Sequence, residues 1–125
     1  MNNIYSFLGL ARKAGKLISG SENCEKAVRN GTARLVVLTE DASGNTRKRF
    51  DDLCISREVV LRVFGMKKDL GHAIGKGDTA VVCITGNGFS DKIIEMLDSL
   101  VSENGGETYG KYGKQSSHIP TGERT

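Results

Sequence analysis

The chain has few of the residues that build disulfide frameworks, metal centres and catalytic triads. Its 125 residues include three cysteines and two histidines. An odd number of widely spaced cysteines argues against a disulfide framework and against CxxC-type zinc sites. We expect buried, unreactive thiols in a reducing compartment, because apolar residues surround Cys24, Cys54 and Cys83. Neither histidine, His72 nor His118, stands near a sequence partner for nucleophilic catalysis. We therefore expect no enzymatic activity, no metal and no cofactor.

Long apolar runs are also missing. No run approaches the ~20 residues that cross a bilayer, and the start of the chain lacks the basic and apolar regions of a secretory signal. We expect a cytoplasmic protein with no membrane contact. The single proline and five of the sixteen glycines lie in residues 104–125, which cannot bury enough apolar area to offset their ordering entropy. The sequence predicts one domain over 1–103 and a flexible glycine-rich polar tail over 104–125.

The formal net charge of +3 is small, but the charge is unevenly distributed. Residues 1–50 hold nine Lys or Arg against four Asp or Glu, whereas residues 51–100 hold six against eight. A local basic excess is typical of a surface that contacts a polyanion, although a solvated basic face gives the same pattern.

Helix and strand patterns alternate along residues 1–103. Apolar residues recur at i, i+3, i+4 and i+7 from Ile4 to Ala11, which predicts an amphipathic helix that ends near Gly15. Continuous apolar runs at 35–39 and 79–85 are typical of strands covered on both faces. The same reasoning predicts strands at 17–18 and 59–63, helices that close at 30–31 and begin near 45–46, a short helix around 70–74, a turn at 86–88, and a last helix with Ser90 as its N-cap. We predict an α/β fold, a three-layer α/β/α sandwich around a four-stranded mixed sheet.

Small and polar residues open the helix that follows the first short strand. Glu22 and Asn23 are adjacent, and Lys26 lies one turn further on. The free N–H groups and the macrodipole make such a helix end positive, so it can receive phosphates or base edges. The alternative is an ordinary capping box between Ser19 and Glu22.

Two acidic residues, Glu40 and Asp41, follow the second long strand. Paired acids at the end of a strand can bind Mg²⁺. The alternative is that Asp41 or Ser43 begins the next turn or helix.

The run from Gly15 to Leu97 resembles the L7Ae/L30e family of kink-turn RNA-binding ribosomal proteins, and is most similar to its small bacterial YlxQ-type members. Four short motifs in the same order carry the resemblance: Ala11-Arg-Lys-Ala-Gly-Lys16, Gly20-Ser21-x-x-x-x-Lys26, Arg34-Leu-Val-Val-Leu-Thr-Glu-Asp-Ala-Ser43, and Lys68-Asp-Leu-Gly-His-Ala-Ile-Gly75.

The resemblance implies the residues that contact RNA. In the family, the helix after the first strand enters the widened major groove of a kink-turn and reads the guanines of tandem sheared G·A pairs. The matching positions are Gly20, Ser21, Glu22, Asn23 and Lys26. Many members have Asn before Glu, whereas this chain has the reverse order. The loop before the last strand packs beside the flipped nucleotide, and its polar, glycine-rich counterpart here is Gly75, Lys76, Gly77 and Asp78. Further implied contacts are Lys16, Ser43, Arg47 and Lys68.

The resemblance also implies a function. It predicts a monomer that binds structured RNA, namely a kink-turn, and stabilises its bend. Ribosomal RNA is one candidate for this RNA, and the predicted role is that of a ribosomal-protein-like accessory factor. Two alternatives stay open: a protein-interaction or stress-response module on the same fold, and an RNA-reading domain partnered with a separate RNA-modifying enzyme.

Overall fold

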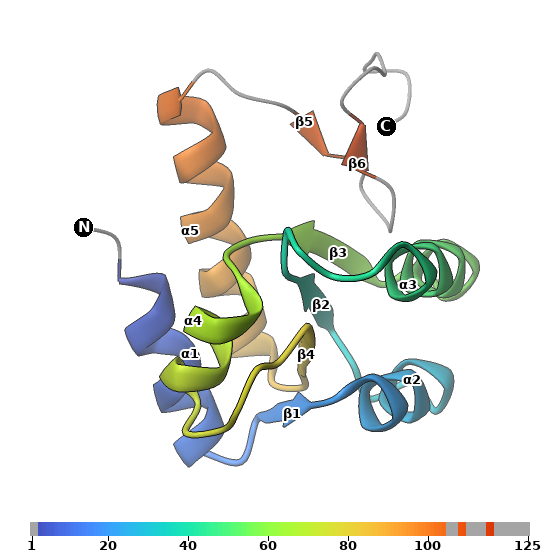
Figure 1. Ribbon diagram of the computed structural model, residues 1–125, viewed down its shortest axis with the longest axis horizontal. Helices are drawn as coiled ribbons and strands as arrows, with labels where there is room; N and C mark the ends of the chain where they lie inside the picture. Colours follow the sequence, from blue (N-terminus) through green and yellow to red (C-terminus); the bar gives the residue numbers. More distant parts are fainter. Residues whose placement is uncertain (1–2, 105–107, 110–114, 117–125) are drawn as a thin grey trace.

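The computed structural model describes residues 3–104, 108–109 and 115–116 (Figure 1). The flexible tail predicted for 104–125 lies largely outside these residues. In chain order the elements are α1 (Ile4–Lys13), β1 (Leu17–Ser19), α2 (Ser21–Arg29), β2 (Leu35–Leu38), α3 (Gly44–Arg57), β3 (Val60–Val63), α4 (Lys67–Ala73), β4 (Val81–Ile84), α5 (Asn87–Asn104), β5 (Thr108–Tyr109) and β6 (Gln115–Ser116). The last two strands pair with each other in antiparallel fashion.

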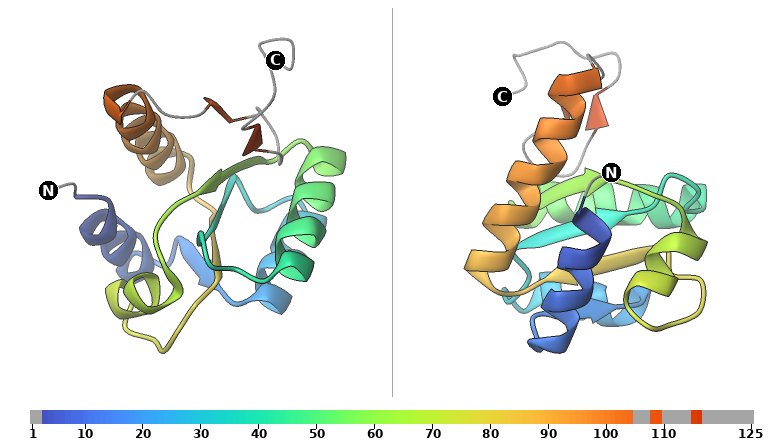
Figure 2. Two further views of the ribbon diagram at one scale, coloured as in Figure 1. Left: turned by 45° about the horizontal axis from the view of Figure 1, so that its top comes forward. Right: turned by 90° about the vertical axis from the view of Figure 1, so that its left-hand side faces the viewer.

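The first four strands form one mixed sheet in the order β1-β4-β2-β3. β2 and β3 are parallel, and β4 is antiparallel to both of its neighbours. Helices α2 and α3 lie side by side on one face of this sheet, and α1, α4 and α5 lie on the other (Figures 1 and 2). The predicted three-layer α/β/α sandwich with a mixed sheet is therefore confirmed.

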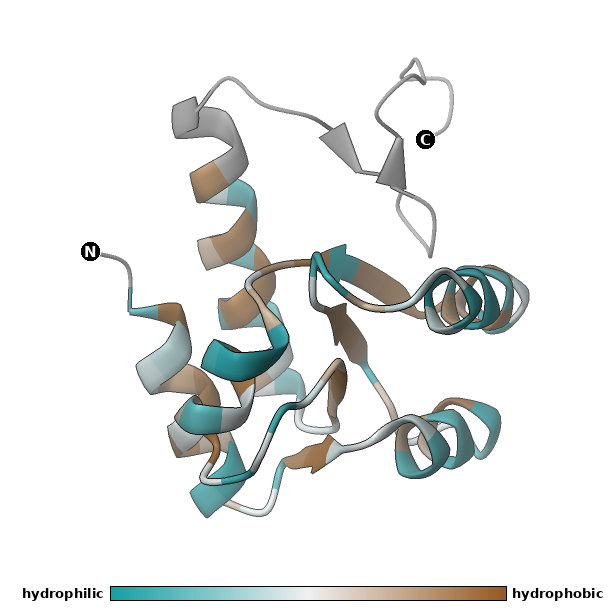
Figure 3. Ribbon diagram, in the orientation of Figure 1, coloured by the Kyte–Doolittle hydropathy of each residue, from teal (hydrophilic) through white to brown (hydrophobic). Residues whose placement is uncertain are grey.

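Alternate residues of the central strands enter two separate cores. Val36 and Leu38 of β2 pack under α2 and α3, whereas Leu35 and Val37 pack under α1, α4 and α5. All four are fully buried, which explains why the strand reads as a continuous apolar run. Figure 3 shows the hydrophobic colour on the central strands and on parts of α1 and α5.

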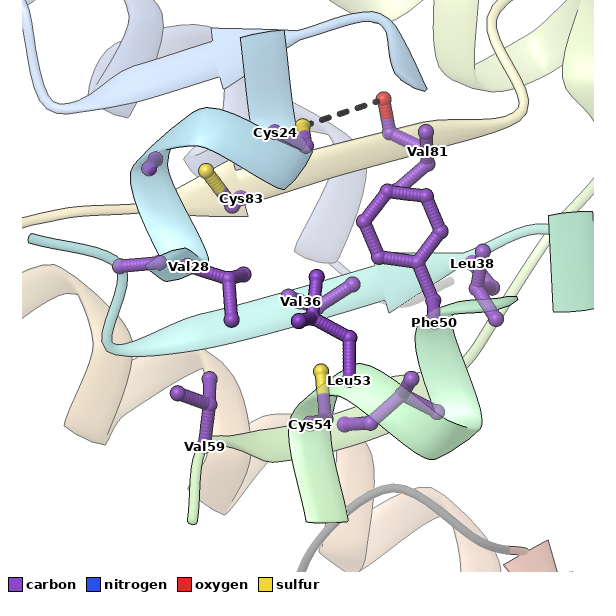
Figure 4. Packing of buried hydrophobic residues seen from close by; sticks show 13 residues of the cluster. Cys24, Val28, Val36, Leu38, Phe50, Leu53, Cys54, Val59, Val81 and Cys83 are labelled. Atoms are coloured by element: carbon purple, nitrogen blue, oxygen red, sulfur yellow. Dashed lines mark hydrogen bonds between the residues drawn. The ribbon is translucent and has the colours of Figure 1, made fainter. Parts of the chain in front are cut away.

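The three thiols lie free and buried in the core under α2 and α3, as predicted (Figure 4). Cys24 contacts the backbone oxygen of Ile18, at 3.4 Å, and that of Val81, at 3.9 Å. The neighbouring Cys83 thiol and burial together raise the pKa of Cys24. Burial, with the Asp51 carboxylate nearby, raises the pKa of Cys54 to about 12. Protonated, buried thiols are poor nucleophiles and poor metal ligands.

The start of α5 is where the sequence prediction is wrong. The sequence predicts a turn at 86–88 with Ser90 as the N-cap, but the helix already begins at Asn87. Ser90 is buried inside the first turn, and its hydroxyl donates to the carbonyl of Asn87 at 3.1 Å. A serine hydroxyl inside a helix can donate to a carbonyl of the preceding turn. Ser90 therefore does not mark the first residue of α5. Among the described residues, no helix has the length and apolar character that a membrane span requires.

Candidate functional site

The strand directions bring several chain segments to one edge of the sheet. Because β4 runs against β1 and β2, the carboxyl end of β1 pairs with the amino end of β4, at Ser19 opposite Val82. Leu38 at the end of β2 pairs with both Val81 and Val63. The segments 19–23, 39–44, 64–68 and 74–80 therefore meet at this edge, which we call the loop edge.

Backbone hydrogen bonds fix two of these segments against the start of β4. The N–H of Gly20 donates to the carbonyl of Val81 at 3.1 Å. The N–H of Thr39 donates to the carbonyl of Ala80 at 2.9 Å. The start of α2 and the segment before α3 are thus anchored to the adjacent carbonyls of Val81 and Ala80, where β4 begins.

Asp41 and Lys67 connect the remaining segments. The Lys67 N–H donates to Oδ1 of Asp41 at 2.9 Å, and the Lys67 carbonyl accepts from the Thr79 N–H at 3.0 Å. Partial desolvation acts to raise the pKa of Asp41. The hydrogen bond from the Lys67 N–H and the nearby Thr39 hydroxyl act to lower it, and their combined effect is larger, so the pKa of Asp41 is lowered. This carboxylate acts as a structural acceptor. Among the described residues, no group of three or more His, Cys, Asp or Glu is placed to hold a metal ion.

The amino end of α2 has free backbone donors. Gly20 is its N-cap, with φ 97°, and provides no side-chain cap. The first intrahelical bond runs from the Cys24 N–H to the Gly20 carbonyl, so the N–H groups of residues 21–23 have no acceptor in the described part of the chain. The capping box between Ser19 and Glu22 is not formed, because Ser19 belongs to β1.

Three polar side chains surround these free donors. Glu22, Asn23 and Lys26 are all exposed. Asn23 makes one long contact, from Nδ2 to the Ser19 carbonyl at 3.5 Å. Lys26 has no ion-pair partner within residues 3–100. A carboxylate, an amide and an ammonium group are therefore available together at a positive helix end.

Helix α3 begins at the same edge but is capped. The Thr46 N–H donates to Oγ of Ser43 at 3.1 Å, and Oγ of Ser43 also bonds to the Thr46 hydroxyl at 3.0 Å. The alternative in which Ser43 begins the helix is confirmed. Arg47 follows one turn later and is half-buried.

The segment before β4 is packed closely against α4. The Lys76 N–H donates to the carbonyl of Gly71 at 2.8 Å, and the Thr79 hydroxyl donates to the carbonyl of Gly77 at 2.8 Å. A Cβ on Gly71 would overlap the carbonyl of Gly77. The exposed residues of this segment are Gly75, Lys76, Gly77 and Asp78.

One predicted residue lies elsewhere, and one residue was missed. Lys16 precedes β1, and its side chain lies against Gly86 beyond the end of β4, at the opposite edge of the sheet. Lys68 is exposed in the first turn of α4, at the loop edge. Its neighbour Lys67 was not predicted, although its backbone bonds to two loop-edge segments. No sequence signal distinguishes these adjacent lysines.

The sequence matches a known family. Residues 2–94 match the ribosomal protein L7Ae/L30e/S12e/Gadd45 family, and the chain belongs to this family. It is 43% identical over 94 residues to the RNA-binding protein YlxQ of Bacillus subtilis (strain 168), covering 75% of this chain and 94% of that protein. It is 36% identical over 93 residues to the RNA-binding protein YlxQ of Enterococcus faecium, covering 74% of this chain and 89% of that protein.

A solved structure has the same fold. It is that of a protein with unknown function from Bacillus halodurans, with a TM-score of 0.76 and 39% sequence identity. The likeness covers 78% of this chain and 99% of that chain.

Proposed function

We propose that this chain binds RNA through the loop edge, that the RNA is a kink-turn, and that binding stabilises its bend. The observation that carries the proposal is the uncapped amino end of α2, where Glu22, Asn23 and Lys26 are exposed beside free N–H groups. Membership of the family and the similarity to two proteins named as RNA-binding support it. The role that follows is that of a ribosomal-protein-like accessory factor.

The chemistry of the α2 end suits guanine edges and phosphates. A lysine can donate to guanine O6, an amide can both donate and accept, and a carboxylate can accept guanine N–H groups. Free helix N–H groups attract phosphate oxygens. A good bidentate base contact is worth about 1–3 kcal/mol, so two such contacts give one to several orders of magnitude in affinity.

The other loop-edge segments provide the phosphate contacts. Lys68 and Lys76 are exposed there, and Lys67 is half-buried, with its backbone N–H bonded to Asp41. A flexible RNA junction exchanges between extended and bent forms, so a protein that contacts the bent form selectively shifts the population towards it. No reacting group is needed for this activity.

The double substitution Asn23→Ala and Lys26→Ala tests the proposal. We expect at least a tenfold loss of affinity for a kink-turn RNA in a gel-shift assay, because both side chains are exposed and neither supports the core. Lys92→Ala, on α5, is the matched control and should leave the affinity unchanged. A second control is the same RNA with its sheared G·A pairs replaced by Watson–Crick pairs.

Two results would contradict the proposal. Equal affinity of the double variant and the native chain would remove α2 from the RNA interface. Equal affinity for the kinked and the fully paired RNA would reduce the function to general RNA binding.

A further inference from the structure

An open apolar groove lies between α1 and α5, away from the loop edge. Its volume is about 600 Å³, and the residues that line it are Phe7, Leu10, Lys13, Ala14, Gly88 and Phe89. The rings of Phe7 and Phe89 contact each other, with centroids 5.2 Å apart. Leu10 is 53% exposed, the most exposed large apolar side chain among the described residues. Isolated exposed leucines are ordinary, but a concave cluster of this kind is typical of an interaction site.

The shape of the groove suits a helical occupant. Helices α1 and α5 lie on the same face of the sheet and contact each other (Figure 2). Ala14 and Gly88 have small or no side chains, and they leave a hollow flanked by Leu10 and the two phenylalanines. An amphipathic helix binds such a groove by inserting bulky apolar residues spaced three or four positions apart.

The charge beside the groove is unequal on its two sides. The α1 side carries Lys13 and, three residues later, Lys16, and neither has an ion-pair partner in the described part of the chain. Helix α1 contains no acidic residue. The α5 side carries Asp91 and the Lys92–Glu95 pair, at 3.7 Å. The uncompensated positive charge therefore lies along the α1 side.

The groove and the loop edge are at opposite ends of the sheet. The groove residues of α1 come just before β1, and those of α5 come just after β4; at that edge Leu17 pairs with Ile84. Lys16 packs its aliphatic chain against Gly86 at the same edge. A partner in the groove would leave the loop edge accessible.

We propose that the α1–α5 groove binds an amphipathic helical segment of another protein. That segment inserts aliphatic or aromatic residues between Leu10 and Phe89, and its acidic residues face Lys13 and Lys16. The chain would then connect an RNA at the loop edge to a protein at the opposite edge. The apolar lining favours a protein segment over RNA, because the charged RNA backbone would make no apolar contacts with this surface.

A selection from random 15-residue peptides displayed on phage, with the full chain as bait, tests the groove. The enriched peptides should share apolar residues at i, i+3 or i+4, and i+7, with Asp or Glu along one flank. Leu10→Glu should weaken the best synthetic peptide at least tenfold, measured by fluorescence anisotropy. The double substitution Lys13→Glu and Lys16→Glu should weaken it by a similar factor.

Matched variants separate the groove from general effects. Ile55→Glu places the same charge on an apolar side chain that is 43% exposed on α3, and Lys48→Glu reverses a charge on that helix. Both should leave peptide affinity within twofold of the native value. Because Leu10 is exposed, we expect its variants to keep the fold, and thermal unfolding of each variant checks this. Leu10→Ser repeats the binding test with an uncharged side chain.

Four outcomes would overturn the proposal. One is that no peptide is enriched, or that enriched peptides bind Leu10→Glu as well as the native chain. Another is that affinity does not depend on the two lysines. A dimer in sedimentation that Leu10→Glu dissociates would assign the groove to a second copy of the chain. A loss of kink-turn affinity in Leu10→Glu, with unchanged peptide binding, would assign it to RNA.

Discussion

Gly71 is a single residue on which the position of a whole loop depends. It lies buried in α4, and the carbonyl of Gly77 occupies the space that a Cβ would need. The Lys76 N–H bonds to the Gly71 carbonyl. This close approach sets how far Lys76 and Asp78 project from the loop edge.

Gly71→Ala should therefore move the 75–78 segment outward. We expect a loss of about 1–3 kcal/mol in the free energy of unfolding, the usual cost of overpacking, and a several-fold weaker kink-turn affinity. Urea denaturation and gel shift measure the two effects. Gly77→Ala is the matched control for the stability measurement, because no atom within 4 Å would meet its Cβ. Equal stability of both variants would show that the loop yields without cost.

Asp41 gives the loop edge a dependence on pH. Its pKa is lowered in the folded chain, so its contribution to stability is fully present above the unfolded value of about 3.9. That contribution is lost as the pH falls through the lower folded pKa, because the protonated carboxyl is a weaker acceptor for the Lys67 N–H.

The Asp41→Ala variant should accordingly be less stable than the native chain at pH 7, and the difference should shrink below about pH 4. Asp41→Asn is the informative companion, since an amide oxygen still accepts a hydrogen bond but does not titrate in this range. Chemical denaturation at a series of pH values measures both. A stability difference that stays constant down to pH 2 would mean that the carboxylate is not the acceptor that matters.

At the scale of elements, α2 and α3 differ although they lie side by side and begin at the same edge. Helix α3 has a serine cap, whereas α2 begins at a glycine with positive φ and has none. An uncapped helix end leaves N–H groups without acceptors, which costs stability unless water or a ligand accepts from them. The α2 end is available for a ligand because its own sequence does not satisfy it.

The cap on α3 should make a measurable contribution. Ser43→Ala removes the acceptor of the Thr46 N–H and should lower the free energy of unfolding by about 1 kcal/mol. Ser99→Ala, at an exposed position of α5, provides the control for the change of residue type. Ser43 is also a predicted RNA contact. The RNA affinity of the folded variant therefore shows whether the Ser43 hydroxyl contacts RNA as well as capping α3. An unchanged midpoint of urea unfolding would contradict the capping role.

At the scale of the whole molecule, the mild net charge conceals a separation. Many basic side chains away from the loop edge are matched by acids, in the pairs Arg29–Glu25, Arg49–Glu25, Lys48–Asp52, Arg62–Asp98 and Lys92–Glu95. The lysines of the loop edge have no such partner among the described residues. Within the described part of the chain, a polyanion therefore meets a group of unpaired lysines at the loop edge, whereas Lys13 and Lys16 form a second unpaired group at the opposite edge.

This separation predicts a modest salt dependence of RNA binding. Three or four phosphate contacts give a slope of log K against log salt of about −2 to −4. Lys76→Ala should make the slope shallower by about 1, whereas Lys48→Ala should not change it. Titrations at four or more salt concentrations measure this, and a slope near zero would argue against an RNA partner.

The sequence predicts the elements well because strand and helix periodicities are strong here. The buried strand β2 and the glycines after α1 and α2 fall at the expected positions. The sequence could not show at which edge of the sheet a residue lies or which way a helix is rotated. The three residues of β1 span about 10 Å, so Lys16 before it and Gly20 after it lie at opposite edges. Lys67 and Lys68 differ only in how α4 is rotated, which tertiary packing decides.

The position of β4 in the sheet has a consequence for how the chain matures during synthesis. β4 is the last of the four strands in the chain, yet it lies between β1 and β2 and is the sole described partner of β1. Until residue 84 has left the ribosome, β1 has nothing to pair with, and Gly20 lacks the carbonyl of Val81 that positions α2. Non-local pairing of this kind forms late. We therefore expect a nascent chain to position the proposed binding end of α2 in one step, only after most of the domain has been translated.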